Sequence, residues 1–181
     1  MRQPVTTDTL NTFMKRLAAT VNTASRIYLV GGATSVLFGW RTSTIDIDLK
    51  IIPESDEILR SLPKIKEQLQ VNIELASPSD FIPELPGWQE RSRFIQQQGK
   101  LSFYHYDFYA QALAKIERGH KMDSQDVEHL VANGLIDGKR LLELFTMIED
   151  QLYRYVAIDG PTFRRAVERV SGTHYETVDE S

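Results

Sequence analysis

The chain has 181 residues, of which 41 % are hydrophobic and 25 % are charged, and its formal net charge is −4. This composition is ordinary for a globular protein and does not by itself indicate nucleic-acid binding. The absence of cysteine excludes a disulfide framework and a cysteine-based metal site. The sequence contains no run of about 18 apolar residues, so it predicts no membrane span. The N-terminus lacks the apolar core of a signal peptide. We therefore expect a cytoplasmic protein without membrane contact.

Hydrophobic periodicity predicts alternating helices and strands up to residue 105. In chain order, we expect a helix at Asp8–Val21, a strand at Ile27–Val30, a helix at Ala33–Phe38, a strand at Ile45–Ile52, a helix at Ser55–Leu69, a strand at Val71–Ala76, a Pro-rich loop at 77–88, and a hairpin of Ser92–Gln97 with Leu101–Tyr106 that turns at Gly99. Pro63 lies inside the third of these helices and can kink or interrupt it.

After residue 106 the pattern changes to helices separated by polar breaks. We expect helices at Asp107–Gly119, Ser124–Asn133, Lys139–Tyr155 and Pro161–Val170, followed by a disordered tail at 171–181. This order predicts an α/β (α+β) fold with a small mixed sheet flanked by helices. The expected organisation is a core at 1–105, a C-terminal helical lobe at 106–170 and the tail.

Two aspartates, Asp46 and Asp48, lie in the strand at 45–52. Because residues two apart point the same way on a strand, both carboxylates share one face, while Ile45, Ile47 and Leu49 anchor the strand to the core. Two carboxylates this close repel each other, and a divalent cation removes that cost. All-oxygen ligands suit Mg²⁺ or Mn²⁺, and such metals can bind the oxygens of a phosphoryl transfer. The plain alternative is a solvated polar face.

Gly31 and Gly32 stand between an apolar strand and the next expected helix. Glycine has no Cβ, so a substrate can approach this backbone closely. The N–H groups of a helix that begins directly after Gly32 can seat a phosphate. Thr34 or Ser35 could add a hydroxyl contact.

This order of residues resembles the DNA polymerase β-like nucleotidyltransferase superfamily, whose signature is G-[GS], a short spacer and D-x-D. The matching residues are Gly31, Gly32, Asp46 and Asp48, with Arg41 and Thr44 in the spacer. The resemblance implies a minimal nucleotidyltransferase fold in which the aspartates hold Mg²⁺ and the glycine turn and its neighbours bind the phosphates of a nucleoside triphosphate (NTP). Position 32 is Gly where many members have Ser, which removes one possible hydroxyl contact.

The resemblance also implies a third carboxylate on a neighbouring strand, which acts as a base toward the acceptor hydroxyl or as a metal ligand. Glu74 is the candidate, because it lies on the polar face of the strand at 71–76, opposite Ile73 and Leu75. The family more often has Asp in this place, and Asp80 in the following loop is an alternative. An exposed strand residue without a role is the plain interpretation of Glu74.

A second cluster of charged residues lies in the stretch 109–130. On a helix, Lys115 and Arg118 share one stripe, and Asp123 and Asp126 follow. Such cations can stabilise a transferring phosphoryl group. The alternative is a solvated face, with Asp123 as the N-cap of the next helix. The order K-x-x-R, turn, D-x-x-D resembles the later motifs of AbiEii-type nucleotidyltransferases, toxins of type IV toxin–antitoxin systems, and this implies that Lys115 and Asp126 are needed for activity.

We therefore expect Mg²⁺-dependent transfer of a nucleoside monophosphate from an NTP to an acceptor, with release of pyrophosphate. Lys115 and Arg118 would clamp the triphosphate, and Asp126 or Glu74 would assist the acceptor. By resemblance, the acceptor is tRNA or a protein, and a cognate antitoxin or toxin is a partner. Three alternatives stay open: an antitoxin-type nucleotidyltransferase that adenylylates a partner toxin, an antibiotic-modifying nucleotidyltransferase, and a non-catalytic binding module.

Overall fold

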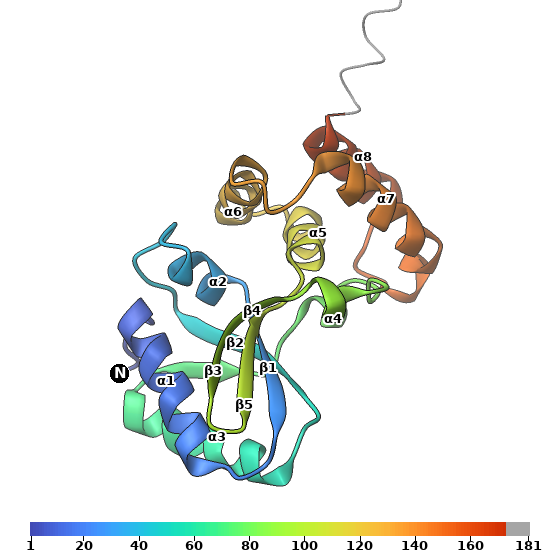
Figure 1. The fold of residues 1–181 in the computed structure, drawn as a ribbon. Helices are drawn as coiled ribbons and strands as arrows, with labels where there is room; N and C mark the ends of the chain where they lie inside the picture. Colours follow the sequence, from blue (N-terminus) through green and yellow to red (C-terminus); the bar gives the residue numbers. More distant parts are fainter. Residues whose placement is uncertain (173–181) are drawn as a thin grey trace, which may run out of the picture. The chain divides into compact units, whose positions relative to one another are not determined.

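The computed structural model describes residues 1–172, and within them the chain divides into two compact units. The first unit comprises 1–77 and 92–106 and contains a five-stranded sheet, whereas the second comprises 78–91 and the chain from 107 onward and is helical (Figure 1). All but the first residue of the loop expected at 77–88 is thus part of the helical unit. Of the expected tail, Ser171 and Gly172 close the last helix, and the remainder lies outside the described residues.

The sheet of the first unit is small and mixed, as the sequence predicts. Its strands are β1 (Ser25–Val30), β2 (Asp46–Ile52), β3 (Asn72–Glu74), β4 (Arg93–Gln98) and β5 (Leu101–His105). They lie in the order β3-β2-β1-β5-β4. Strand β1 is antiparallel to β2 and parallel to β5, β2 is parallel to β3, and β4 and β5 form the expected antiparallel hairpin.

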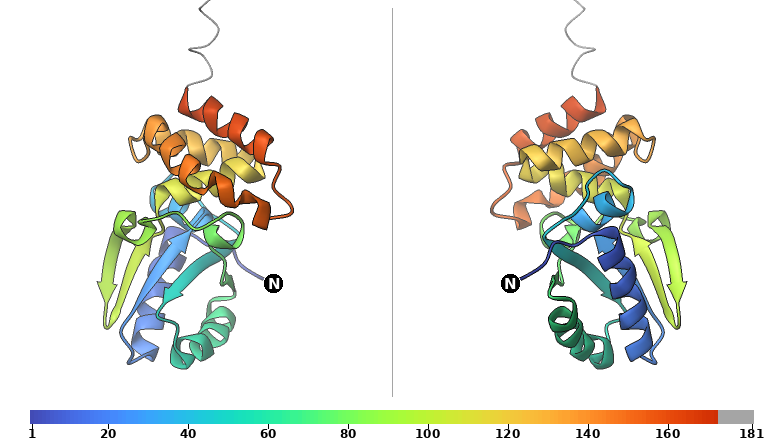
Figure 2. Two further views of the ribbon diagram at one scale, coloured as in Figure 1. Left: turned by 90° about the vertical axis from the view of Figure 1, so that its right-hand side faces the viewer. Right: turned by 90° about the vertical axis from the view of Figure 1, so that its left-hand side faces the viewer.

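Three helices belong to the first unit: α1 (Thr7–Thr20), α2 (Gly32–Leu37) and α3 (Asp56–Leu69). Helices α1 and α3 pack against each other and cover one face of the sheet (Figure 2). The apolar stripes of both helices and the inward residues of the strands form one core. Side chains of Thr6 and Ser55 cap the two helices. Helix α3 continues through Pro63, so this proline does not interrupt it.

Two apolar residues that the alternation places in the core are exposed instead. Ile45 is 77 % exposed because it precedes the first residue of β2, and Leu75 is 51 % exposed because it follows the last residue of β3. The expected strand at 71–76 is therefore reduced to three residues. Between these ends, Ile47 and Leu49 are buried as predicted, and they turn the two aspartates to the opposite face.

The second unit is built from helices. They are α4 (Trp88–Arg91), α5 (Phe108–Arg118), α6 (Lys121–Ala132), α7 (Gly138–Ile148) and α8 (Gly160–Ser171), with short 3-10 helices η1 (Pro78–Asp80) and η2 (Glu149–Arg154). The single helix expected at 139–155 is thus divided into α7 and η2. Phe145 and Phe163 meet edge to face at 4.9 Å in the core of this unit. In the part of the chain that the structure describes, no helix is long and apolar enough to cross a membrane.

Candidate active site

Three carboxylates gather on the polar face of the sheet of the first unit. Asp46 and Asp48 come from β2 and Glu74 from β3, and the parallel pairing sets Asp48 directly beside Glu74. One ligand oxygen from each of the three residues lies within 4.8 Å of the others. Among residues 1–172, no other group of three or more His, Asp or Glu side chains converges in this way, so Asp80 has no part in such a cluster.

Asn72 links two of these carboxylates. Its Nδ2 atom donates to Oδ1 of Asp46 at 2.6 Å and to Oε1 of Glu74 at 2.8 Å. The amide orients the two side chains but is neutral, so it does not cancel their charge. Asn72 was not among the predicted site residues, although its position two residues before Glu74 puts both side chains on one face of the strand.

The chemistry of the three side chains fits a hard divalent cation. Asp46 and Asp48 are half-buried and Glu74 is exposed, so their repulsion is only partly screened by water. All the donors are carboxylate oxygens, which Mg²⁺ and Mn²⁺ prefer, and the set lacks the nitrogen and sulfur atoms that favour zinc. Asp46, Asp48 and Glu74 are therefore the residues that could hold such an ion.

The glycine pair lies beside this acidic triad of Asp46, Asp48 and Glu74. Gly31 has φ 66° and ψ −125°, a backbone conformation open mainly to glycine, and it stands as N-cap of α2. A Cβ added at Gly31 would lie 3.8 Å from Oδ2 of Asp48. The antiparallel register explains this proximity, because Val30, the last residue of β1, pairs with Asp48. A ligand held by Asp48 would thus lie against the turn.

The other candidates near the turn differ in their access to a ligand. Thr34 and Ser35 are 2 % and 1 % exposed, so both hydroxyls lie inside the unit. Arg41 is partly exposed, and its backbone N–H donates to the carbonyl of Ser35 at 3.4 Å. Thr44 is also partly exposed and approaches Gly32 from the loop between α2 and β2. The structure therefore sets Thr44 and Arg41 nearer to solvent than the two hydroxyl residues of α2.

His105, at the end of β5, packs against α2, the helix that begins at Gly32. Its Nδ1 atom lies 2.9 Å from the hydroxyl of Thr34, and its ring stacks on Phe38 with 4.9 Å between centroids. Burial, together with the positive charge of Arg93, lowers the pKa of His105 to about 4. The imidazole is therefore neutral near pH 7. Sequence reasoning missed this role, because the contact joins residues 71 positions apart.

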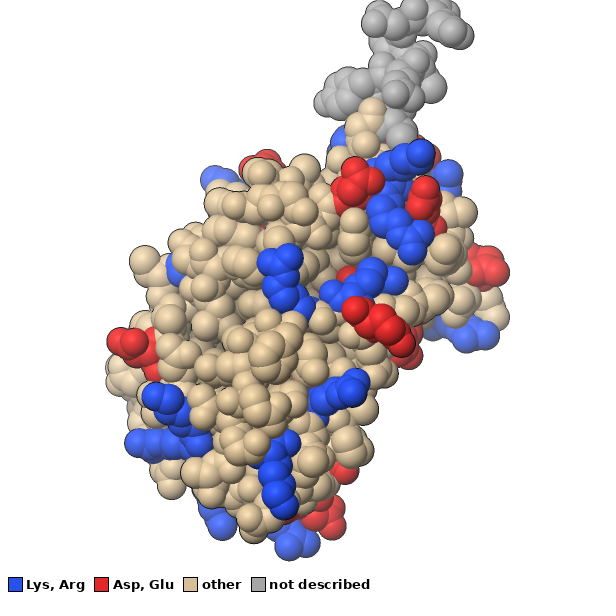
Figure 3. Space-filling model, in the orientation of Figure 1, with Lys and Arg blue, Asp and Glu red and all other residues tan. Residues whose placement is uncertain are grey.

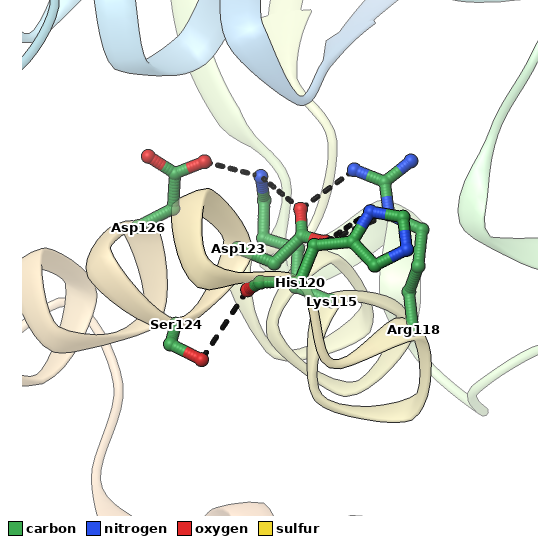
Figure 4. Close-up of polar contacts among 6 residues, drawn as sticks. All are labelled: Lys115, Arg118, His120, Asp123, Ser124 and Asp126. Carbon is green, nitrogen blue, oxygen red and sulfur yellow. Dashed lines mark hydrogen bonds and ion pairs between the residues drawn. The ribbon is translucent and has the colours of Figure 1, made fainter.

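The second cluster, built in the helical unit from Lys115, Arg118, Asp123 and Asp126, is paired within itself (Figure 4). Nζ of Lys115 donates to Asp126 at 2.6 Å, and the guanidinium of Arg118 donates to both oxygens of Asp123 at 2.7 and 2.6 Å. Both carboxylates are buried. The positive charges on α5 are thus balanced by the negative charges on α6.

The start of α6 differs from the expectation. The helix begins at Lys121, with His120 as N-cap. Asp123 is therefore not the cap but lies in the first turn, where it accepts a hydrogen bond from Arg118. Ser124 donates its hydroxyl to the carbonyl of His120 at 3.3 Å (Figure 4). Burial alone would raise the pKa of Asp123, but the hydrogen bond and charge of Arg118, with the charge of Lys115, bring that pKa below its ordinary value.

Surface charge on the side drawn in Figure 3 is dispersed. Lys and Arg side chains are scattered among uncharged and acidic residues on that side.

Comparison with known proteins points to one family. A family model described as a nucleotidyltransferase of unknown function (DUF6036) matches residues 8–167, which include the acidic triad, the glycine pair and the second cluster. No curated protein and no solved structure matches the chain significantly.

Proposed function

The chain belongs to the DUF6036 family of nucleotidyltransferases, and from this premise we propose that it transfers a nucleoside monophosphate from an NTP to an acceptor. The observation that carries the proposal is the convergence of Asp46, Asp48 and Glu74 within 4.8 Å on two adjacent strands. Three repelling carboxylates beside an accessible glycine turn lower the stability of a pure scaffold, but they suit the binding of a cation with its phosphate ligand.

The proposed reaction is a displacement at the α-phosphorus of the NTP. An acceptor hydroxyl oxygen bonds to this phosphorus, the bond to the bridging oxygen of the β-phosphate breaks, and pyrophosphate leaves with that electron pair. Asp46, Asp48 and Glu74 would hold Mg²⁺, which when bound supplies positive charge against the negative charge of the phosphates. The backbone at Gly31, which faces Asp48, lets the phosphates approach closely, whereas the Cβ position of Gly32 is filled by Thr44.

A carboxylate must accept the proton that the acceptor hydroxyl loses. Glu74 is exposed and belongs to the acidic triad, so it can meet both an acceptor and the cation. Asp126 is 2 % exposed, and its carboxylate already accepts a hydrogen bond from Lys115 at 2.6 Å. We therefore favour Glu74 for proton transfer, and we assign Asp126 first to positioning Lys115.

Lys115 and Arg118 remain candidates for contacts with the triphosphate. To bind a phosphate, Lys115 and Arg118 would have to divide their positive charge between that phosphate and the carboxylates of Asp126 and Asp123, which now balance it. An arginine with a 60 % exposed side chain can turn toward a new anion more readily than a lysine that is 11 % exposed. We therefore propose that Arg118 makes the first phosphate contact of this cluster. Lys115 would keep the side chains of the cluster in place.

For the acceptor we propose tRNA or a protein, and for the biological setting a toxin–antitoxin or phage-defence pair with a cognate partner. The order of the motifs around Lys115 and Asp126, which resembles AbiEii-type nucleotidyltransferases, supports this setting.

The test is a label-transfer experiment. The protein is incubated with each of the four α-³²P-labelled NTPs, Mg²⁺ and total tRNA, in parallel with a cell extract as a source of protein acceptors. A matched Asp46→Asn/Asp48→Asn variant serves as the control. We expect label on RNA or protein, and released pyrophosphate, only with the unaltered chain. No transfer, together with no Mg²⁺-dependent NTP binding, would instead indicate a non-catalytic module.

A further inference from the structure

A row of three aromatic side chains crosses the sheet of the first unit. The strand pairings set Phe94 of β4 beside Tyr104 of β5, and Tyr104 beside Tyr28 of β1. Tyr28 and Tyr104 stack with 5.2 Å between ring centroids, and Phe94 and Tyr104 meet edge to face at 5.6 Å. The three rings therefore form one continuous aromatic surface over three strands, the aromatic row.

The aromatic row and the acidic triad lie on the same face of the sheet. Lys50 continues the row on β2, because it pairs with Tyr28, and it follows Asp48 by two residues. Residues two apart on a strand point the same way and are about 7 Å apart. Tyr104 lies two strands from β2, so at about 4.8 Å per strand its backbone is about 12 Å from that of Asp48. A chain molecule that lies on the rings can thus extend to the triad.

The outer end of the aromatic row is open to solvent. Phe94 is 54 % exposed and Tyr104 is partly exposed, whereas Tyr28 is 1 % exposed. Tyr28 therefore supports the ring of Tyr104, and a ligand would meet Tyr104 and Phe94. Cross-strand aromatic pairs also stabilise sheets by themselves, so the kind of ligand has to be inferred from the charges nearby.

Positive charge lies beside the aromatic row. Arg26 precedes Tyr28 by two residues on β1, and its guanidinium donates a hydrogen bond to the hydroxyl of Tyr28. Arg26, Lys100 and Ser102 line a cavity of about 400 Å³ at the end of the sheet, a size within the usual range of ligand pockets. Among residues 1–172, neither of these two cations, nor Lys50, forms an ion pair with a carboxylate. Their charge is thus available to an anionic ligand.

We propose that this face of the sheet binds the single-stranded 3′ end of an RNA acceptor. Bases stack on Phe94 and Tyr104, and backbone phosphates lie at Arg26 and Lys100. Aromatic side chains combined with cations hold single strands without a preferred sequence. The inference rests on the proposed nucleotidyl transfer and goes further, because it selects RNA over a protein as the acceptor. A ribose hydroxyl of the RNA end then supplies the oxygen that bonds to the α-phosphorus, and it gives its proton to Glu74.

The first experiment tests stacking at Phe94. Binding of a fluorescein-labelled single-stranded RNA of about ten nucleotides, long enough to fill one single-strand site, is measured by fluorescence anisotropy for the unaltered chain, Phe94→Leu and Phe94→Trp. Leucine is apolar but has no ring, so we expect about tenfold weaker binding. Tryptophan keeps a ring, so its affinity should stay within about threefold of the original.

The Phe94→Trp variant also gives a direct signal of stacking. Unlabelled RNA should quench the fluorescence of the new indole beyond any change seen in the unaltered chain. A purely structural role of Phe94 would not produce this quenching. The thermal midpoints of both variants should equal that of the unaltered chain, because the side chain is more than half exposed.

The second experiment tests the phosphate contacts through salt. Arg26→Gln/Lys100→Gln should reduce the slope of log Kd against log salt concentration by about 1.4, since each contact with a single strand contributes about 0.7. The matched control is Lys15→Gln/Lys64→Gln, which removes two exposed cations from α1 and α3, the helices on the opposite face. The control should leave the slope unchanged. An equal slope in Arg26→Gln/Lys100→Gln and the unaltered chain would refute the phosphate contacts.

The remaining outcomes separate this inference from the proposed function. Equal RNA affinity of Phe94→Leu and the unaltered chain refutes stacking on the aromatic row. A duplex bound as tightly as the single strand also refutes it, because paired bases cannot stack on the rings. If protein in a cell extract is labelled but RNA does not bind, the inference fails while nucleotidyl transfer stands. If RNA binds as expected but no acceptor is labelled, the proposed function fails and the face stands as an RNA-binding surface.

Discussion

Two clusters of aspartates in this protein have opposite electrostatic settings. On the sheet, Asp46 and Asp48 join a third carboxylate, and the bridging side chain of Asn72 is neutral. On the helices, Asp123 and Asp126 are more deeply buried, but each accepts hydrogen bonds from a cation. Burial costs an aspartate free energy in both places, and in the helical cluster the charges of Lys115 and Arg118 offset this cost.

This difference shows what each cluster is suited for. A self-neutralised ion-pair network contributes to holding α5 and α6 in register, and it loses stability when one partner is removed. Neighbouring carboxylates repel one another, and the folded state gains stability when a cation binds between them. The same substitution, Asp to Asn, should therefore have opposite effects on folding in the two clusters.

The largest effect is expected at Asp48. Asp48→Asn removes a ligand of the proposed Mg²⁺ site, so nucleotidyl transfer should fall by about 10³-fold. Without Mg²⁺ the free energy of unfolding should stay equal or rise by up to about 1 kcal/mol, because one repelling charge is gone. Urea unfolding in EDTA measures the stability and label transfer the activity. A clear loss of stability in EDTA would contradict the account of the triad as a repelling cluster.

The matched change in the helical cluster should act in the other direction. Asp126→Asn removes the charged partner that lies 2.6 Å from the nearly buried ammonium of Lys115 and leaves it with the more distant carboxylate of Asp123, at 3.9 Å. Breaking a buried ion pair in this way lowers the free energy of unfolding by about 3–5 kcal/mol, which urea unfolding of the same preparation would detect. Lys115→Met/Asp126→Leu serves as control, since replacing both partners should restore much of the loss. Full stability of Asp126→Asn would show that the pair contributes nothing to folding.

His105 is a third case, a basic group kept neutral by burial. Its pKa of about 4 in the folded chain lies below its ordinary value of 6.5. Below pH 6.5 the unfolded chain therefore binds a proton that folded His105 does not take up until about pH 4. The contribution of His105 to the free energy of unfolding should decrease by up to about 3 kcal/mol as the pH falls through this interval, and it should stay constant above it.

The control for this pH dependence is His105→Gln, which keeps a polar side chain near Thr34 and cannot titrate. Urea unfolding between pH 7 and pH 4 should give a flatter profile for this variant than for the unaltered chain. Two parallel profiles would mean that His105 is protonated equally in the folded and unfolded states.

The smallest expected effect is stabilisation by the ion itself. At ten times its Kd, Mg²⁺ should raise the free energy of unfolding by about 1.4 kcal/mol. The same increment is expected for Asp126→Asn, because that cluster needs no ion, and none is expected for Asp48→Asn. Thermal midpoints measured with and without Mg²⁺ test this directly. An equal shift in both variants would place Mg²⁺ binding outside the acidic triad.

Several features of the site could be predicted from the sequence because they depend on neighbours along the chain. The alternation around Ile47 and Leu49 assigns Asp46 and Asp48 to one face, since side chains alternate on any strand. The glycine pair after an apolar run predicts a tight turn into a helix, and Gly31 adopts a positive φ there. The same reasoning placed Ile45 and Leu75 in the core wrongly, because strand ends are decided by pairing with another strand.

The sequence by itself determined the local patterns of this protein: the face that carries the aspartates, the glycine turn, the helical periods and the motif order that predicts a nucleotidyltransferase. Only the tertiary structure decided which distant residues meet. The pairing of β2 with β3 brings Glu74 to Asp48, the bridge to Val5 holds Thr44 over Gly32, and the contact of α5 with α6 balances Lys115 with Asp126. Periodicity acts over a few residues, whereas register and burial arise when segments far apart in the chain pack together.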